Sequence, residues 1–147
     1  MEVQHGGLII DVPEGWSDQS TLLFVAPRDS QTAATVAKVA VPTEAVAVRF
    51  RGTDGLDAVA VLAEELSGVR AADPDAVELE AGPFSCPLGA GAFRVVRLRV
   101  SQAPLVQLTA AVVLGPVCIL ATASAAEARF PRVRDELLRV LQSMRFS

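Results

Sequence analysis

The sequence has few of the side chains that carry out chemistry. It contains one histidine, His5, and two cysteines, Cys86 and Cys118, which lie far apart. One histidine and two isolated cysteines lack the spacing of a metal site. The two glycines after His5 are a weak match to an oxyanion-hole motif, and no G-x-S-x-G nucleophile motif accompanies them. We therefore expect a protein that is not an enzyme and that binds no metal or cofactor.

Positive charge is also scarce. The formal net charge is −4, the sequence pI is about 5.0, and Lys38 is the only lysine. A nucleic-acid-binding domain needs a basic face, so we expect no nucleic-acid partner.

The sequence also lacks a secretory signal. Its first residues contain no basic segment followed by a sustained apolar stretch, so we expect a soluble, cytoplasmic protein that is not embedded in a membrane. The two cysteines are flanked by apolar residues and are expected to be buried thiols in a reducing compartment. A disulfide between them stays open on sequence grounds.

Charge is absent from residues 100–126, a run long enough to cross a bilayer as a helix. Gly115-Pro116 lies in the middle of this run, and a proline there would kink a helix. β-branched residues are frequent, which suits strands. Polar side chains also interrupt the run, namely Gln107, Thr109, Thr122 and Ser124. We predict a hairpin of two strands that turns at Gly115-Pro116.

The remaining chain predicts an α+β fold in one domain over residues 1–147. Helices are expected over 54–68, capped by Asp54 and stopped by Gly68, and over 128–146. Glu64 and Glu65 lie off the apolar stripe of the first helix and are expected to be solvated. Strands are expected over 8–16, 20–27, 44–50, 77–88 (interrupted at Gly82-Pro83) and 92–100, with a loop over 28–43. This order favours a curved, largely antiparallel sheet of six or seven strands with two main helices.

The late strands are predicted to have two unlike faces. We place a turn near 101–103, with Arg99 opposite Gln107 and Arg97 opposite Thr109, and we place Thr109 opposite Thr122 across the next turn. One face is then wholly aliphatic and must be core. The other mixes apolar and polar side chains: Phe93, Val95, Arg97, Arg99, Gln107, Thr109, Ala111, Val113, Leu120, Thr122 and Ser124.

The mixed face is the candidate binding site. If both helices pack on the aliphatic face, the mixed face is left as an interaction surface. Its polar groups could satisfy donors and acceptors of a bound apolar segment, which are costly to bury unpaired. Two alternatives stay open: one helix covers this face, with Arg97 and Arg99 at its border, or the face forms a homodimer seam.

The segment IIDVPEGWSDQSTLLFVAP (9–27) resembles the opening of the DcrB-related family. It has an apolar strand, a Pro-x-Gly-Trp turn, an acidic residue and a strand that ends in proline. The resemblance implies the fold shared by the PsbP and Ran-binding Mog proteins. It also implies a likeness to the cytoplasmic Eag chaperones of type VI secretion, homodimers that hold N-terminal transmembrane segments of an effector until it is loaded on the secretion spike. The polar residues on that family's late strands would correspond to Arg97, Arg99 and Gln107.

The predicted function is therefore a chaperone or adaptor for an apolar, transmembrane-type segment of a secreted effector, with a secretion spike protein as a further partner. The alternative is a structural or regulatory adaptor that binds a folded partner through its sheet face. Trp16 is expected to anchor the first turn in the core. The predicted client-binding residues are Phe93, Val95, Arg97, Arg99, Gln107, Thr109, Ala111, Val113, Leu120 and Thr122.

Overall fold

A computed structural model describes residues 2–5, 7–20, 23–25 and 44–147. Its described residues form a seven-stranded antiparallel sheet in the order β3-β4-β5-β9-β8-β7-β6 and a small sheet in the order β1-β2-β10. This confirms the α+β class and the prediction of six or seven strands in the main sheet. The strands are β1 (Glu2–His5), β2 (Leu8–Asp11), β3 (Ser17–Ser20), β4 (Leu23–Val25), β5 (Glu44–Gly52), β6 (Val77–Cys86), β7 (Gly89–Val100), β8 (Ala103–Leu114), β9 (Val117–Ala126) and β10 (Arg145–Phe146), and the described helices are α2 (Ala58–Ala72) and α3 (Phe130–Gln142).

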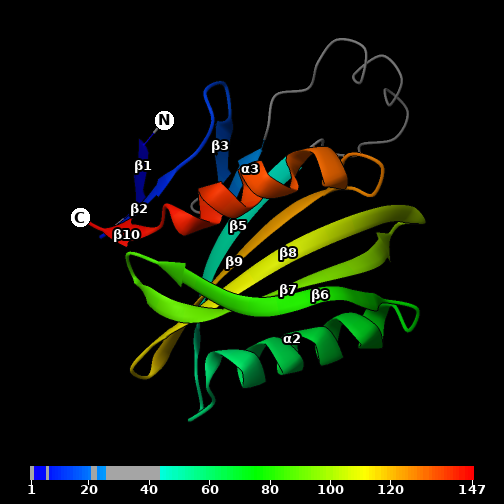
Figure 1. Ribbon diagram of the computed structural model, residues 1–147, viewed down its shortest axis with the longest axis horizontal. Helices are drawn as coiled ribbons and strands as arrows, with labels where there is room; N and C mark the ends of the chain where they lie inside the picture. The colour runs from blue at the N-terminus through cyan, green and yellow to red at the C-terminus, as the bar shows by residue number, and fades with distance from the viewer. Residues whose placement is uncertain (1, 6, 21–22, 26–43) are drawn as a thin grey trace.

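The two helices lie on opposite faces of the large sheet (Figure 1). We call these the α2 face and the α3 face. The expectation that both helices pack on one face is wrong. The structure instead follows the alternative in which a helix also covers part of the face that carries Gln107 and Thr109.

The main hydrophobic core lies between α3 and the sheet. The inward face of α3 contributes Val133, Leu137 and Leu141, and the facing strands contribute aliphatic side chains such as Leu108 and Ile119. Trp16 is buried in this core, as predicted. The α2 face has two smaller clusters of its own, so the helices do not share a core.

Helix α2 begins later and ends later than the sequence predicts. Asp54 and Gly55 have positive φ angles of 52° and 79° and form a turn before the helix. Asp57 is the N-cap, because its side chain accepts a hydrogen bond of 2.8 Å from the amide of Ala60. The helix continues through Gly68, which was expected to stop it.

The β7–β8 turn decides which side chains share a face. It contains only Ser101 and Gln102, both with positive φ (50° and 71°), and Val100 pairs with Ala103. Left-handed conformations at both central residues are typical of a two-residue hairpin. Arg97 therefore lies opposite Val106, and the predicted pairing of Arg97 with Thr109 is wrong. Because the register differs by an odd number of residues, every β7 side chain changes face.

The β8–β9 pairing is confirmed, with Gln107 opposite Ser124 and Thr109 opposite Thr122. At the edge of the sheet, β6 runs unbroken through Gly82-Pro83, and its irregularity lies between Glu78 and Glu80 instead. Within the strand predicted over 20–27, Leu23–Val25 form β4, which pairs antiparallel with β3. Residues 21–22 and 26–27 of that prediction lie outside the described residues. The loop predicted over 28–43 lies outside the described residues.

Candidate functional site

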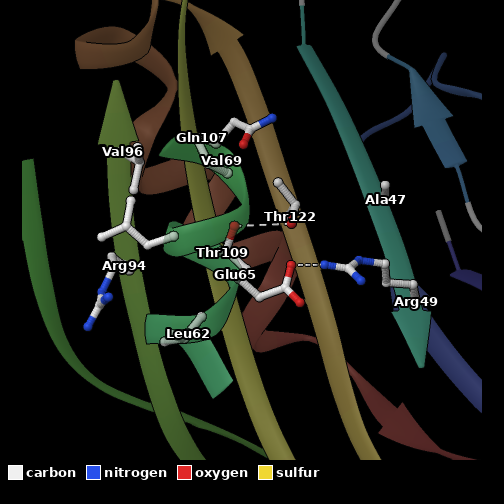
Figure 2. A pocket seen from close by; sticks show the side chains of 11 residues that line it. Ala47, Arg49, Leu62, Glu65, Val69, Arg94, Val96, Gln107, Thr109 and Thr122 are labelled. Carbon is white, nitrogen blue, oxygen red and sulfur yellow. Dashed lines mark hydrogen bonds and ion pairs between the residues drawn. The ribbon is translucent and has the colours of Figure 1, made fainter. Parts of the chain in front are cut away.

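A cleft of about 320 Å³ lies between α2 and the sheet, on the side of α2 that faces β5 and β9 (Figure 2). Ligand-binding pockets in proteins begin at about this size. Helix α2 packs mainly on β7 and β8, so it covers one part of the α2 face and forms a wall beside the next. The cleft is lined by Ala47, Arg49, Leu62, Glu65, Leu66, Val69, Arg94, Val96, Gln107, Thr109 and Thr122.

The floor of the cleft continues as a strip of small or hydrogen-bonding side chains. Strand pairing places Ala45 opposite Ser124, Ala47 opposite Thr122, and Gln107 opposite Ser124. All of these side chains are half-buried, so they are partly accessible beside α2. We call Ala45, Ala47, Gln107, Thr109, Thr122 and Ser124 the cleft strip. Small side chains let the backbone of a bound segment approach closely.

The cleft strip has hydrogen-bonding capacity that the fold does not use. The hydroxyl oxygens of Thr109 and Thr122 lie 3.1 Å apart and form one hydrogen bond, which leaves the proton of one hydroxyl free to donate. The Gln107 carboxamide has no hydrogen-bond partner within the described part of the chain, and its side chain is labelled at the cleft in Figure 2. An apolar cleft with a few such groups can orient a ligand as well as exclude water from it.

Ion pairs join α2 to β5 at the mouth of the cleft. Arg49 pairs with Glu65, as the dashed line in Figure 2 marks. Arg51 lies 2.6 Å from Glu64 and 3.1 Å from Glu65. The hydrogen bond that Arg51 donates to Glu64, followed by the one it donates to Glu65, raises the pKa of Arg51. Glu64 is exposed, as expected, whereas Glu65 is half-buried and the expectation that it is solvated is wrong. The ion pairs of both residues were not predicted; they form because alternation along β5 directs both arginines toward α2.

Arg94 lines the cleft from β7, but its guanidinium points away from Gln107 and Thr122 (Figure 2). Its Nε atom lies 3.3 Å from the carboxylate of Glu78 and makes no hydrogen bond there, although only 15% of the side chain is exposed. Arg94 was not predicted as a site residue, because the expected register placed it on the opposite face.

The structure divides the ten predicted client-binding residues between the two faces. Six lie on the α2 face, but Ala111 and Leu120 are fully buried beneath α2 and Val113 packs against them. The predicted residues that line the cleft are Gln107, Thr109 and Thr122.

The other four predicted residues lie on the α3 face. Val95 is buried in the main core and Phe93 packs against it. Arg97 pairs with Glu127 at 3.4 Å, and the amide of Arg99 donates a 2.8 Å hydrogen bond to Asp73. None of these four lies on a surface shared with Gln107, because the two-residue turn reverses the faces of β7.

Several cleft residues were missed because they come from other segments. Leu62, Leu66 and Val69 lie on α2, whereas Ala47 and Arg49 lie on β5. The sequence features that could have indicated these residues are the apolar stripe of the helix and the alternation of side chains along β5. Using these features requires knowing that α2 crosses this face.

The remaining candidate chemistry is limited. Within the described residues there is no group of three histidine, cysteine or acidic side chains that could hold a metal ion. Cys86 and Cys118 are free thiols, and Cys118 is fully buried beneath α2, where burial raises its pKa. Neither α2 nor α3 has the length and apolar character needed to cross a bilayer.

Comparison with known proteins shows the fold and no closer relationship. No family model and no curated protein matches the chain. Its structure is similar to the Ran-binding protein Mog1p of Saccharomyces cerevisiae, with a TM-score of 0.67 and 15% identity over 98% of this chain and 92% of that one. It is also similar to the cyanobacterial PsbP protein (CyanoP) of Synechocystis sp. PCC 6803, with a TM-score of 0.64 and 16% identity over 96% and 87%. LpqN of Mycobacterium tuberculosis gives a TM-score of 0.63 and 15% identity over 100% and 90%. The chain therefore has the PsbP-like, Mog-like α+β fold that its sequence predicts.

Proposed function

We propose that this protein is a non-enzymatic adaptor that binds an apolar segment of another protein in the cleft beside α2. The single observation that carries the proposal is the cleft strip, which is half-buried, lined by small side chains, and equipped with hydrogen-bonding groups that the fold leaves unused. A bound segment would cover Ala47 and contact the wall formed by Leu66 and Val69.

The chemistry of the strip favours a helical or otherwise internally hydrogen-bonded segment. Exposed main-chain donors and acceptors are costly to bury, and the strip offers partners for only a few of them. A helix satisfies its own main chain and needs partners only for isolated polar side chains. Gln107 and the Thr109–Thr122 pair are suited to that task, since such residues hydrogen-bond between helices in membranes.

We further propose the kind of partner that this protein binds. The resemblance to the DcrB-related and Eag proteins supports an N-terminal transmembrane segment of a secreted effector, delivered to a type VI-like apparatus by a cytoplasmic homodimer. Among the structural neighbours, Mog1p is described as Ran-binding and LpqN as involved in cell envelope biogenesis. An adaptor that acts through a protein partner is consistent with the first of these descriptions.

Co-expression tests the proposal. The protein would be produced with a tagged fusion that carries an apolar segment of about 20 residues, and the fusion retained on the purified protein would be measured. Gln107→Leu keeps the side-chain size but removes the carboxamide, so capture should weaken by about fivefold, the equivalent of one hydrogen bond. Ala47→Arg fills the strip and should reduce capture at least about tenfold, since it removes contact area as well.

Arg97→Ala is the matched control, because Arg97 is exposed on the α3 face. The proposal requires capture to be unchanged in this variant. If Arg97→Ala loses capture while Ala47→Arg retains it, binding occurs on the other face and the cleft is not the site. Retention of a folded partner but of no apolar segment would favour the alternative adaptor function.

A further inference from the structure

Helix α2 is packed on the sheet as a separate unit. Its buried residues, Val61, Leu62 and Leu66, contribute to two small clusters that are distinct from the main core under α3. Five residues of α3 are buried, by comparison. Removing α2 would therefore expose its own clusters and leave the main core in place. Elements with such limited burial are the ones that open locally in native proteins.

The attachments of α2 on the β5 side are mainly ionic. Arg49 and Arg51 on β5 pair with Glu64 and Glu65 on the helix, and three of these four side chains are at least one-quarter exposed. Ion pairs at the surface are weakened by salt, unlike apolar contacts. The cluster can thus act as a latch whose strength depends on ionic strength.

The two ends of α2 provide tethers. Before the helix, Thr53 is buried, its amide donates a 3.0 Å hydrogen bond to the carbonyl of Pro116, and the turn at Asp54 and Gly55 follows with positive φ angles. After it, both carboxylate oxygens of Asp73 accept backbone hydrogen bonds, one of them from Arg99 at the end of β7. Helix α2 can therefore move away from the sheet while the turn at its start and the Asp73 hydrogen bonds at its end keep both ends attached.

We propose that α2 is an opening cover, held by the Arg49/Arg51–Glu64/Glu65 latch over the apolar floor formed by Ala92, Ala111, Cys118 and Leu120. Opening enlarges the cleft from the strip to the whole α2 face and frees two arginines at its border. The surface so exposed fits an apolar helix with acidic side chains along one edge, which would replace the contacts of α2 itself. The use of opening for binding rests on the proposed function, but the opening does not.

The chain contains reporters for both processes. Cys118 is fully buried in the cluster beneath α2, and Trp16, the only tryptophan, is buried in the main core. In a Cys86→Ala background, alkylation of Cys118 by N-ethylmaleimide measures opening of α2, whereas Trp16 fluorescence measures global unfolding. The two reporters can be followed in the same urea series without any client.

The expected result is alkylation of Cys118 at least about tenfold faster than the globally unfolded fraction allows, because local opening is more frequent than global unfolding. Alkylation should accelerate as salt is raised to about 1 M, where the screening length is about 3 Å. Arg49→Gln combined with Arg51→Gln should raise the low-salt rate and remove the salt dependence. The matched control is Arg134→Gln, which breaks an ion pair with Glu80 on the α3 face. It should change neither the low-salt alkylation rate nor the salt dependence of that rate.

The inference is overturned if Cys118 alkylation follows Trp16 unfolding at every urea concentration. It is also overturned if salt has no effect on the unsubstituted latch, a measurement that does not depend on whether the double variant folds. Rapid, salt-dependent alkylation without capture of an apolar segment would support the cover and contradict the proposed function. Capture of the apolar segment without faster alkylation of Cys118 would support the proposed function and contradict the cover.

Discussion

Replacement of Gly91 by alanine should severely destabilise the sheet. A Cβ atom at this position would lie 1.9 Å from the carbonyl oxygen of Ala111, 2.9 Å from its carbonyl carbon and 3.2 Å from the Cα atom of Val112. All three contacts are with the backbone of β8, which cannot rotate away as a side chain could. The strands must therefore separate by about 1 Å to reach even a tight non-bonded contact.

The cost follows from where Gly91 lies. Gly91 pairs with Val112 in β8 and with Phe84 in β6, so separation disturbs ladder hydrogen bonds and the buried contacts of Phe84. Loss of two or three hydrogen bonds at about 1 kcal/mol each gives a decrease of about 3 kcal/mol in the free energy of unfolding. For a chain of this size, such a decrease lowers Tm by about 10 °C.

Urea unfolding followed by Trp16 fluorescence measures this decrease. Gly68→Ala is the matched control, because Gly68 lies inside α2 and nothing is within 4 Å of an added Cβ atom. That variant should raise the free energy of unfolding by up to about 1 kcal/mol, the usual difference in helix propensity. The reasoning is refuted if Gly91→Ala unfolds within about 0.5 kcal/mol of the parent protein.

Three further predictions concern stability. Arg129→Met removes the guanidinium that donates to the Glu44 carboxylate at 2.7 Å and 2.9 Å. Glu44 is 5% exposed and Arg129 42%, so the free energy of unfolding measured by urea titration should fall by about 1–3 kcal/mol, less than for a fully buried pair. Glu44→Gln should lower the free energy of unfolding by a smaller amount. Thr122→Val removes the hydrogen bond to Thr109 and should lower the free energy of unfolding by about 1 kcal/mol, whereas an unchanged value would mean that this bond is not formed in solution. Burial raises the pKa of Cys118. The buried neutral thiol therefore contributes its full stabilisation below the ordinary thiol pKa, and this contribution declines as the pH rises from that value to the raised one. Urea titrations at several pH values should show this decline, which should be absent in Cys118→Ala.

Much of the fold could be predicted from local signals. Gly115-Pro116 marks a turn, and the alternation on either side of it gives the β8–β9 register, including the Thr109–Thr122 pair. The apolar stripe of α3 predicts its buried face. In each case one short segment contains the information.

The candidate site could be predicted only in part, because its composition depends on one turn. Ser101 and Gln102 adopt left-handed conformations that asparagine and glycine favour, so the sequence carries no strong signal for a two-residue hairpin. An odd error in register exchanges Arg97 for residues such as Val96 on the α2 face. The position of α2 over β7 and β8 is a tertiary property, and no local pattern specifies it.

The most direct test of the central claim is site-specific cross-linking of the bound segment. A photoreactive benzoylphenylalanine would replace Val69 in the α2 wall of the cleft, which leaves the cleft strip open, or, as the control, Arg132 on the exposed side of α3. Each protein would be co-expressed with the tagged apolar segment and irradiated. The account predicts cross-links from position 69 and none from position 132; cross-links from position 132 alone would contradict it.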